Sequence, residues 1–521
     1  MKNPPSTNGR ELTTRSGGAV VPAAFAFAAL VLHLLWIESY GWFRDEFYYV
    51  VCGERLAFGY VDHPPLVALI ARLTRALLGD SLAALRLPSV LAGAAVVFLC
   101  GWLAREMGGG RLAQALASLC ALIAPVYLFT FHIYSMNSFD VLFWTLGALV
   151  VIRIVKTGGA RLWLLFGAIA GLGLQNKHSM LFFGLGVFAG LLLTPERRHF
   201  RAPWIWLGGL LAAVVFLPNV IWEIVNGWPT LEFIRNATAN KNVALSPLEF
   251  FKEQVFQMHP LTFPVWLAGL GWLLLSRAGR PFRLLGWMYL AIFAVLVSQA
   301  SKAYYLAPVY PVLFAAGGAA IESALRRLSG SWPRPAIATA ILLLLVAGGA
   351  ATAPLTLPVL PVERFIPYAR ALGVEISAGE RHRMGDLPQH YADMHGWEEI
   401  VAEVKRVYDS LPPEEKAGAK VFGQNYGEAG AIDVLGRAHG LPRAISGHNN
   451  YFLWGPGDLG NLSRVLIVIG GDEEDNRANC PSLERAGEIR CGYCMPYEDR
   501  QPVYLCRGID PGIWPAVKSY N

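Results

Sequence analysis

The sequence contains little charge. Asp, Glu, Lys and Arg make up only 16% of its 521 residues, whereas 54% are hydrophobic and the mean hydropathy is +0.39. Soluble domains carry roughly 25% charged residues, so the composition excludes an ordinary soluble enzyme. The basic residues occur in short clusters between apolar runs and not along one polar face, which argues against nucleic acid as a partner.

Long apolar runs replace the missing charge. Eleven of them approach the ~20 residues that a helix needs to cross a bilayer. The fifth and sixth are short, so the count has a margin of one or two. The first run exceeds a signal-peptide core and has no convincing cleavage site before Tyr40, so we expect a retained anchor. The predicted spans lie near 19–38, 87–104, 112–131, 139–156, 162–176, 179–193, 204–223, 260–276, 283–300, 304–321 and 335–353.

Lys and Arg are scarce in the short connections on one side of the predicted membrane domain. Segment 132–138 holds neither, and the connection near residue 301 holds only Lys302. Basic residues collect on the cytoplasmic side of membrane proteins, which predicts a cytoplasmic N-terminus. An odd number of spans then places loops 39–86 and 224–259, and the chain after 354, outside. The basic connections hold Lys2, Arg10, Arg15, Arg105, Arg111, Arg153, Lys156, Arg161, Arg197, Arg198, Arg201, Arg277, Arg280, Arg283, Arg326, Arg327 and Arg334.

The chain after residue 354 has a different character, rich in charged and turn-forming residues. Its length of about 165 residues is enough to bury a core of its own, and its β-branched runs predict a small α/β domain. We expect strands at 420–423 and 464–471 and helices at 397–409 and 427–439. The predicted organisation is a cytoplasmic tail (1–18), a polytopic all-α membrane domain (19–353) and an extracytoplasmic α/β domain (354–521).

Four of the seven cysteines lie within 27 residues of this last part. In an oxidising compartment Cys480, Cys491, Cys494 and Cys506 favour two disulfides, with the pairing left open. The alternative is a zinc site that uses Cys491 and Cys494, whose spacing suits it.

The first outer loop gathers charge at the membrane surface. It contains R-D-E-F-Y-Y at 44–49 and G-Y-V-D-H-P-P-L at 59–66. Charges at that depth are costly unless they face water or a partner, so they indicate a functional site. Two plainer interpretations remain open: Asp45 and Glu46 form a solvated pair, and Asp62 caps an amphipathic surface helix whose first turn holds Pro64 and Pro65.

An ordered set of motifs resembles the GT-C membrane glycosyltransferases of the protein-mannosyltransferase type, which include the lipid A aminoarabinose transferases. Its members are D-E-x-Y-Y and G-Y-x-D-H-P-P-L in the first outer loop, then 171–179, 219–229, 259–270, 301–311 and 446–456. The resemblance implies transfer of a sugar from a polyprenyl-phosphate carrier, undecaprenyl or another, to a lipid, glycan or protein acceptor at the outer face, usually with inversion. A polytopic lipid or sugar transporter is the alternative, disfavoured because we find no inverted repeat.

The resemblance also implies roles for individual residues. Asp45 takes the position of the acid that acts on the acceptor nucleophile, with Glu46 in reserve. Asp62 takes an acidic metal-binding position, and His63 replaces a phosphate-binding lysine, which makes phosphate binding at His63 less assured. His259 is a second candidate ligand for a divalent metal. Its plainer interpretation is an interfacial histidine bonded to backbone.

Three further charges and a tyrosine complete the candidate site. Asp140 is expected to face the donor sugar, although a carboxylate early in a helix also complements the helix dipole. Lys302 is isolated in an outer connection otherwise without basic residues, and such a cation suits a phosphate leaving group. Lys177 is a second such cation. Tyr305 is assigned to the donor phosphate with them, or else to an interfacial aromatic belt.

Overall fold

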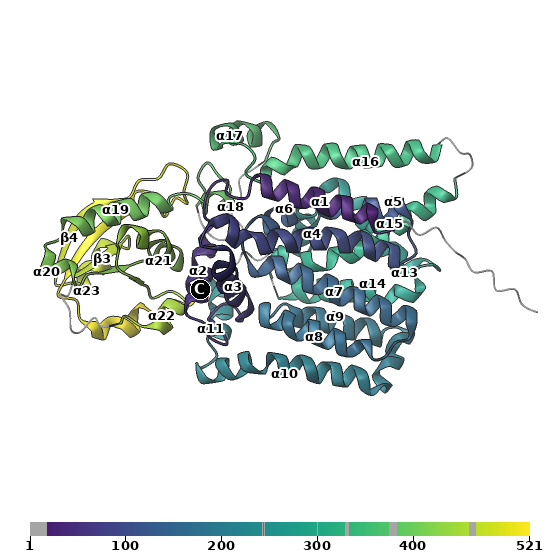
Figure 1. Ribbon diagram of the computed structural model, residues 1–521, viewed down its shortest axis with the longest axis horizontal. Coiled ribbons are helices and arrows are strands. Elements are labelled where there is room, and N and C mark those ends of the chain that lie inside the picture. Colours follow the sequence, from purple (N-terminus) through teal and green to yellow (C-terminus); the bar gives the residue numbers. More distant parts are fainter. Residues whose placement is uncertain are drawn as a thin grey trace, which may run out of the picture.

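The computed structural model describes residues 18–241, 243, 245–299, 301–328, 333–374, 383–457 and 465–521. Figure 1 shows two parts: a long bundle of helices and a smaller part built on a sheet. Short helices, among them α2 (Arg44–Glu54) and α3 (Leu66–Leu78), lie between the two. The expected mostly helical body with a C-terminal α/β part is therefore present. Nearly all of the expected N-terminal tail, including Lys2, Arg10 and Arg15, lies outside the described residues.

Every predicted apolar run coincides with a helix. Burial patterns differ within the bundle: α15 is largely enclosed, whereas α10 and α16 lie on opposite flanks and expose most of their apolar side chains (Figure 1), as expected of lipid-facing helices. The helices of the bundle are α1 (Val20–Leu35), α4 (Leu82–Glu106), α5 (Arg111–Ile123), α6 (Pro125–His132), α7 (Met136–Thr157), α8 (Leu162–Asn176), α9 (Met180–Leu192), α10 (Pro203–Val225), α13 (Phe263–Leu275), α14 (Arg283–Ser298), α15 (Tyr310–Arg326) and α16 (Pro333–Thr352).

Several spans are broken by proline. In the described chain six helices are long and apolar enough to cross a membrane, and up to nine if each bent pair is one span. The bends are 64° between α5 and α6, 111° after α9 at η1 (Pro195–Arg201), and 97° between α12 (Pro247–Gln257) and the segment that starts at Pro260. Proline has no N–H to donate and clashes with the preceding turn. α1 and α8 are apolar but shorter. The count of eleven spans remains a prediction.

The outer loops are more helical than expected. α3 begins directly after Pro65, as predicted, and its apolar stripe exposes Leu69, Leu73 and Leu77. Loop 224–259 is largely helical. It forms α11 (Pro229–Asn236), a short π-helical turn η2 (Ala237–Lys241) and α12, which starts with a Ser246 capping box.

The C-terminal part contains a five-stranded mixed sheet of order β2-β1-β3-β5-β4. β1 pairs in parallel with β2 and β3, and β5 pairs antiparallel with β3 and β4. β1 and β3 confirm the two predicted strands, and α19 and α21 confirm the two predicted helices. The elements are β1 (Lys420–Phe422), β2 (Ala444–Ile445), β3 (Val465–Ile469), β4 (Ser482–Glu488), β5 (Pro502–Arg507), α17 (Val362–Ala371), α18 (Gln389–Ala392), α19 (Trp397–Ser410), α20 (Pro413–Lys416), α21 (Tyr426–Val434), α22 (Asn450–Trp454) and α23 (Glu473–Asn479).

The cysteines of this part form two disulfides, as favoured from sequence. Cys480 pairs with Cys506, and Cys491 pairs with Cys494. The first joins the start of β4 to β5. Asp499 lies with Cys491 and Cys494 in a group of potential metal ligands, but disulfide sulfurs are not the thiolates that zinc requires.

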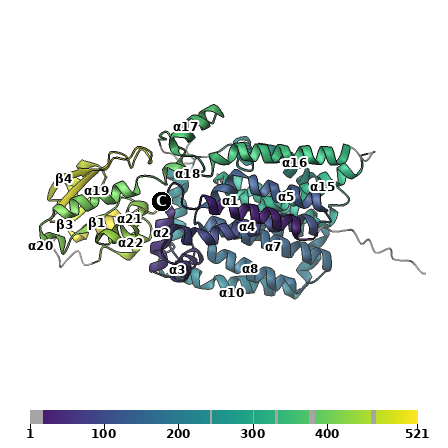
Figure 2. The same cartoon turned by 45° about the horizontal axis from the view of Figure 1, so that its top comes forward.

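α2 connects the two parts of the molecule. Phe47, Tyr48 and Val51 are buried in the same apolar cluster as Ile432 of α21 and Ile467 of β3. Helices α2 and α21 are in close contact: a Cβ added at Gly430 of α21 would lie 2.7 Å from the Phe47 side chain. Figures 1 and 2 both show α2 at the junction with α21. The C-terminal part is therefore packed directly onto the helix that carries the outer-loop acids.

Candidate active site

Asp45 lies in the first turn of α2, half-buried, and faces the C-terminal part. The phenolic hydroxyl of Tyr426 donates a 2.7 Å hydrogen bond to Asp45 Oδ1. Burial, followed by the neighbouring Asp45 carboxylate, raises the pKa of Tyr426 well above its ordinary value, so the phenol remains a donor. This hydrogen bond orients the Asp45 carboxylate at the interface between the helical bundle and the C-terminal part.

Arg44, the residue before Asp45, fastens the same turn. Its guanidinium makes a 2.5 Å ion pair with Glu498 and lies 3.7 Å from Asp393. Both acids belong to the C-terminal part and are almost fully buried. The backbone next to Asp45 is therefore held in place by ion pairs between Arg44 of α2 and two acids of the C-terminal part.

Glu46 has a different environment from Asp45. It is fully buried, and its carboxylate accepts two hydrogen bonds from Arg86 at 2.7 and 2.9 Å. It also accepts from the backbone N–H groups of Phe43 and Tyr134 at 2.7 and 2.8 Å. Four hydrogen bonds saturate this carboxylate. The geometry favours a role in fixing the start of α2 over a role as the reserve catalytic acid.

Asp62 does not cap the surface helix. Position N-cap of α3 is Pro65, and no side chain caps that end, so the capping interpretation is wrong. Instead Asp62 Oδ1 accepts a 2.9 Å hydrogen bond from Tyr48 of α2. Because Tyr48 and Tyr426 lie with ring centroids 4.9 Å apart, Asp62 and Asp45 are held by neighbouring tyrosines.

His63 is buried among aromatic rings. Its centroid lies 4.7 Å from Tyr60 and 5.2 Å from Tyr49. Burial lowers the pKa of His63 to about 4, so the ring is neutral at physiological pH. Nδ1 lies 2.8 Å from the Pro64 carbonyl, and Nε2 has no hydrogen-bond partner among the described residues. A neutral imidazole can donate a hydrogen bond to a phosphate but cannot replace a lysine charge.

The structure brings three of the predicted donor-site residues together where α7 begins and α8 ends. Lys177 Nζ donates a 2.6 Å hydrogen bond to Asn137 and lies 3.9 Å from Asp140. The same ammonium lies 4.7 Å from the ring centroid of Tyr305, within the range of a cation–π interaction. We call Asn137, Asp140, Lys177 and Tyr305 the lysine cluster.

Asp140 belongs to this cluster because Lys177 and Ser179, both in the connection between α8 and α9, lie against its carboxylate. Ser179 donates a 2.7 Å hydrogen bond to Oδ2, while buried Oδ1 has no partner in the described chain. Asp140 is the fifth residue of α7, and the helix has no acidic residue in its first turn, so the dipole interpretation does not apply. Oδ1 is buried, and the Trp144 indole is a further neighbour of this carboxylate.

Lys302 occupies the position directly before η5 (Ala303–Val309), the 3₁₀ segment that carries Tyr304 and Tyr305. Both tyrosine rings lie within cation–π range of Lys177, at 5.5 and 4.7 Å. Lys302 is therefore close in sequence to Tyr304 and Tyr305, whose rings lie against Lys177.

Asp45 and the lysine cluster are linked through two intermediate residues. Tyr49 of α2 lies within electrostatic reach of Asp45 and hydrogen-bonds Ser135. Ser135 in turn accepts hydrogen bonds from the backbone and side-chain nitrogens of Asn137, at 3.2 and 2.9 Å. A proton acceptor and a cation are thus placed on the same side of the bundle.

The expected metal pair, Asp62 and His259, stays a prediction. His259 is 2% exposed, and its Nδ1 accepts a 3.1 Å hydrogen bond from the Leu261 backbone, which is the plainer of its two interpretations. Within the part of the chain that the structure describes, the single group of three metal-type ligands is Cys491, Cys494 and Asp499.

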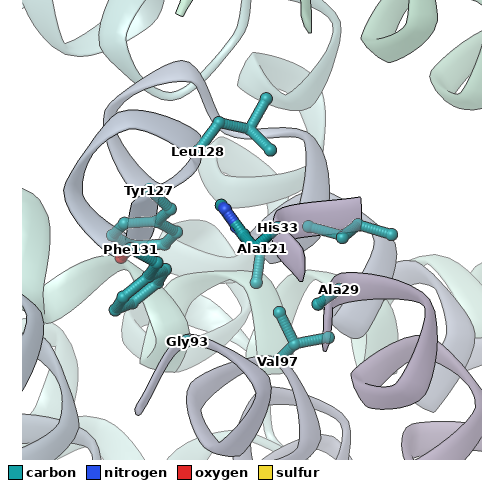
Figure 3. Close-up of a pocket in the computed structure, with 9 residues that line it drawn as sticks. Ala29, His33, Gly93, Val97, Ala121, Tyr127, Leu128 and Phe131 are labelled. Carbon is teal, nitrogen blue, oxygen red and sulfur yellow. The ribbon is translucent and has the colours of Figure 1, made fainter. Parts of the chain in front are cut away.

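A small void lies elsewhere, inside the bundle between α1, α4, α5 and α6. It is too narrow to hold a water molecule, and its walls are mainly apolar. Figure 3 shows the His33 ring and the Tyr127 and Phe131 rings pointing into it. None of the candidate residues lines the void. It is a packing defect of the bundle and not part of the site.

Sequence reasoning missed Tyr426 and Arg86. Tyr426 is 381 residues away from Asp45 along the chain and carries no local signal. Arg86 did carry a local signal, because it is a single cation directly before a predicted span and follows a loop that holds Asp45 and Glu46. A buried acid needs such a cation as its partner.

Comparisons with known proteins agree with this architecture. Residues 62–222 match the family dolichyl-phosphate-mannose-protein mannosyltransferase. Lipid A galacturonosyltransferase RgtD of Rhizobium johnstonii is 22% identical over 299 residues, an alignment that covers 56% of this chain and spans 62% of that relative's length.

Two solved structures of ArnT from Cupriavidus metallidurans have a similar fold. The form bound to undecaprenyl phosphate aligns with a TM-score of 0.59 at 16% identity, over 93% of this chain and 97% of that one. The apo form gives a TM-score of 0.58 at the same identity and coverage. These matches confirm the resemblance that the ordered motifs indicated: the chain has the GT-C membrane fold of ArnT.

Proposed function

We propose that this protein is a multi-pass inner-membrane glycosyltransferase that moves a sugar from a polyprenyl-phosphate carrier to an acceptor at the outer face, with inversion. The observation that carries the proposal is the placement of the Tyr426-oriented Asp45 carboxylate on the same side as the lysine cluster. Transfer from a sugar phosphate requires a base for the acceptor and positive charge for the leaving group. The site provides both.

The proposed reaction is a single displacement. Asp45 accepts the proton of the acceptor hydroxyl as its oxygen forms a bond to the anomeric carbon. The bond from that carbon to the phosphate oxygen breaks, and the electron pair leaves with the carrier phosphate. Lys177 and Lys302 stabilise the developing phosphate charge, and His63 contributes a hydrogen bond. Asp140, with one oxygen unpartnered among the described residues, faces the sugar.

The printed names of the relatives guide the choice of substrates. ArnT was solved with undecaprenyl phosphate, and RgtD is named for lipid A. We propose a polyprenyl phosphate, undecaprenyl or similar, as the carrier, and a lipid-linked saccharide ahead of a free glycan or protein as the acceptor. The C-terminal α/β part is proposed to lie outside the cytoplasm, where its disulfides are stable.

The test combines a donor panel with one substitution. Purified protein is incubated with polyprenyl-phosphate sugars, and release of free carrier phosphate is measured. Asp45→Asn keeps the side-chain size and removes the basicity, so we expect transfer to fall by about 10²–10⁴-fold while carrier binding persists. Asp409→Asn, on the exposed face of α19, is the matched control. Carrier movement across the bilayer without phosphate release would instead identify a transporter, and activity of Asp45→Asn within threefold of wild type would remove Asp45 from the mechanism.

A further inference from the structure

A second site lies at the other end of α2. A hollow of about 120 Å³, open to solvent, is formed where the end of α2 meets β1, β2 and α22. Three cations line it: Arg55 follows α2, Lys420 begins β1, and Arg443 precedes β2. Figure 1 shows α22 beside the short helices at the junction of the two parts. The hollow is separate from the void inside the bundle and from the lysine cluster.

Positive charge is in excess around this hollow. Glu54, next to Arg55 in the sequence, is partly buried and is already bound by Arg437 at 2.8 Å and Arg75 at 3.1 Å, with Arg443 more distant at 3.4 Å. Asp433 is buried, and its oxygens accept from the Ala444 backbone and from Tyr451. The acids are thus engaged with other groups, which leaves a basic hollow suited to an anion.

The walls of the hollow are also aromatic. Arg55 lies over the Trp454 ring, 4.5 Å from its centroid, and Tyr451 lies 4.9 Å from the same tryptophan. A flat aromatic surface packs well against the C–H face of a sugar ring, because the ring face carries partial negative charge. Guanidinium groups bind phosphate and carboxylate in bidentate geometry. The combination suits an anionic saccharide better than an isolated ion.

Aromatic rings connect this hollow to Asp45. Tyr48 lies with centroid distances of 6.5 Å to Trp454 and 4.9 Å to Tyr426, and Tyr426 binds Asp45 directly. Arg55 and Asp45 are ten residues apart along α2, which is about 15 Å at 1.5 Å per residue. A short oligosaccharide spans that distance.

We propose that this hollow binds a phosphate- or carboxylate-bearing sugar of the acceptor, anchoring an anionic saccharide while another part of it reaches Asp45. The inference rests on the proposed glycosyl transfer. It names the acceptor as an anionic saccharide of more than one sugar and assigns its recognition to Arg55, Lys420 and Arg443. The reacting end of the acceptor then lies at Asp45, and the carrier phosphate lies at the lysine cluster.

Binding is tested on the full chain in nanodiscs of neutral phosphatidylcholine, with lactose 1-phosphate as the probe. Lactose and inorganic phosphate are the comparison ligands, and phosphatidylglycerol vesicles are a competitor. We expect lactose 1-phosphate to bind at least tenfold more tightly than either comparison ligand. Lys420→Met and Arg443→Gln should each weaken it by about fivefold, and the double variant by about 25-fold.

Arg437→Gln is the matched control, since Arg437 pairs with Glu54 on the same surface but does not line the hollow. It should bind the probe as wild type does, and melting temperatures should confirm that all variants are folded. Equal binding of lactose and lactose 1-phosphate, or an equal loss in Arg437→Gln, would overturn the site. Inorganic phosphate or phosphatidylglycerol competing as strongly as the probe would overturn its assignment to a saccharide.

The same assay separates this inference from the proposed reaction. Asp45→Asn should bind lactose 1-phosphate normally, because Asp45 lies at the other end of α2. If wild type binds the probe through Lys420 and Arg443 yet releases no carrier phosphate with any donor, glycosyl transfer fails and the saccharide site stands. Transfer that proceeds with unchanged acceptor KM in the double variant, with no probe binding in wild type, rejects the site and leaves the reaction intact.

Discussion

Tyr426 of the C-terminal part donates its phenolic hydrogen to Asp45 of the first outer loop across 2.7 Å, and the two residues are 381 positions apart in sequence. The acid proposed as the catalytic base is thus oriented by a residue from outside the membrane bundle. In the proposed mechanism, this relationship places the α/β part at the active site and makes its docking on α2 a condition for activity.

Replacing Tyr426 by Phe tests this relationship. A hydrogen bond to a charged group contributes about 1.5–3 kcal/mol, so we expect kcat to fall by about 10- to 150-fold. Carrier affinity should be unchanged. The acidic limb of the pH–rate profile should move to higher pH, because the lost donor favoured the charged carboxylate. Tyr408→Phe, which loses a hydroxyl bound to the Lys416 carbonyl in the same part of the protein, is the control. Equal profiles for both variants would reduce Tyr426 to a packing residue.

Glu46 and Arg86 form a buried ion pair that should be visible in stability. Removing one partner leaves an unpaired buried charge, which costs about 3–5 kcal/mol. We therefore expect Glu46→Gln and Arg86→Met each to lower the melting temperature strongly. The double variant Glu46→Gln/Arg86→Met should lose less than the sum of the two, because it leaves no uncompensated charge. Fluorescence-monitored melting of the four proteins checks this, and additive losses would argue against direct coupling.

The amount that sequence can predict differs between the fold and the site. Periodicity and hydropathy locate the helices of the bundle and strands β1 and β3, since these elements bury their own apolar residues. Spacing and isolation of charge also identify Asp140, Lys177 and Tyr305, which the structure brings together. Bends at Pro125 and Pro260 change how runs divide into spans, so hydropathy alone does not give the span count.

The sequence could not predict which distant side chains contact the acids of the first loop. Nothing local distinguishes Glu46 from Asp45, yet the first is saturated by Arg86 and the second faces Tyr426. Helix capping was one of two open interpretations of Asp62, but α3 has no side-chain cap and Tyr48 binds Asp62 instead. In each case the outcome depends on which distant side chain the fold places opposite, and pattern reasoning along the chain carries no such information.

Lys302 and Lys177 should both affect the carrier. Lys302→Met keeps the aliphatic stem and removes the charge, so we expect polyprenyl-phosphate sugar and free carrier phosphate to bind about 10- to 150-fold more weakly, with acceptor affinity little changed. Lys177→Met should have the same effect, and Lys177→Arg should restore part of it. Exposed Lys252 of α12 supplies the control Lys252→Met. Normal carrier binding by Lys302→Met would leave the phosphate to Lys177.

The proposed orientation is testable with reporters. If the basic connections lie in the cytoplasm, a reporter fused after Gly109 or Arg198 should report the cytoplasm, and one fused after Asn240 or Gly457 should report the outer compartment. The helices make these positions informative: Gly109 and Arg198 lie at one end of the bundle, between α4 and α5 and after α9, whereas Asn240 follows α11 near the other end. Alkaline phosphatase and a cytoplasm-active fluorescent protein give opposite signals at each site. A cytoplasmic signal at Gly457 would place the α/β part on the side where disulfides are reduced, and with it Tyr426, so that the proposed outer-face site fails together with the odd span count.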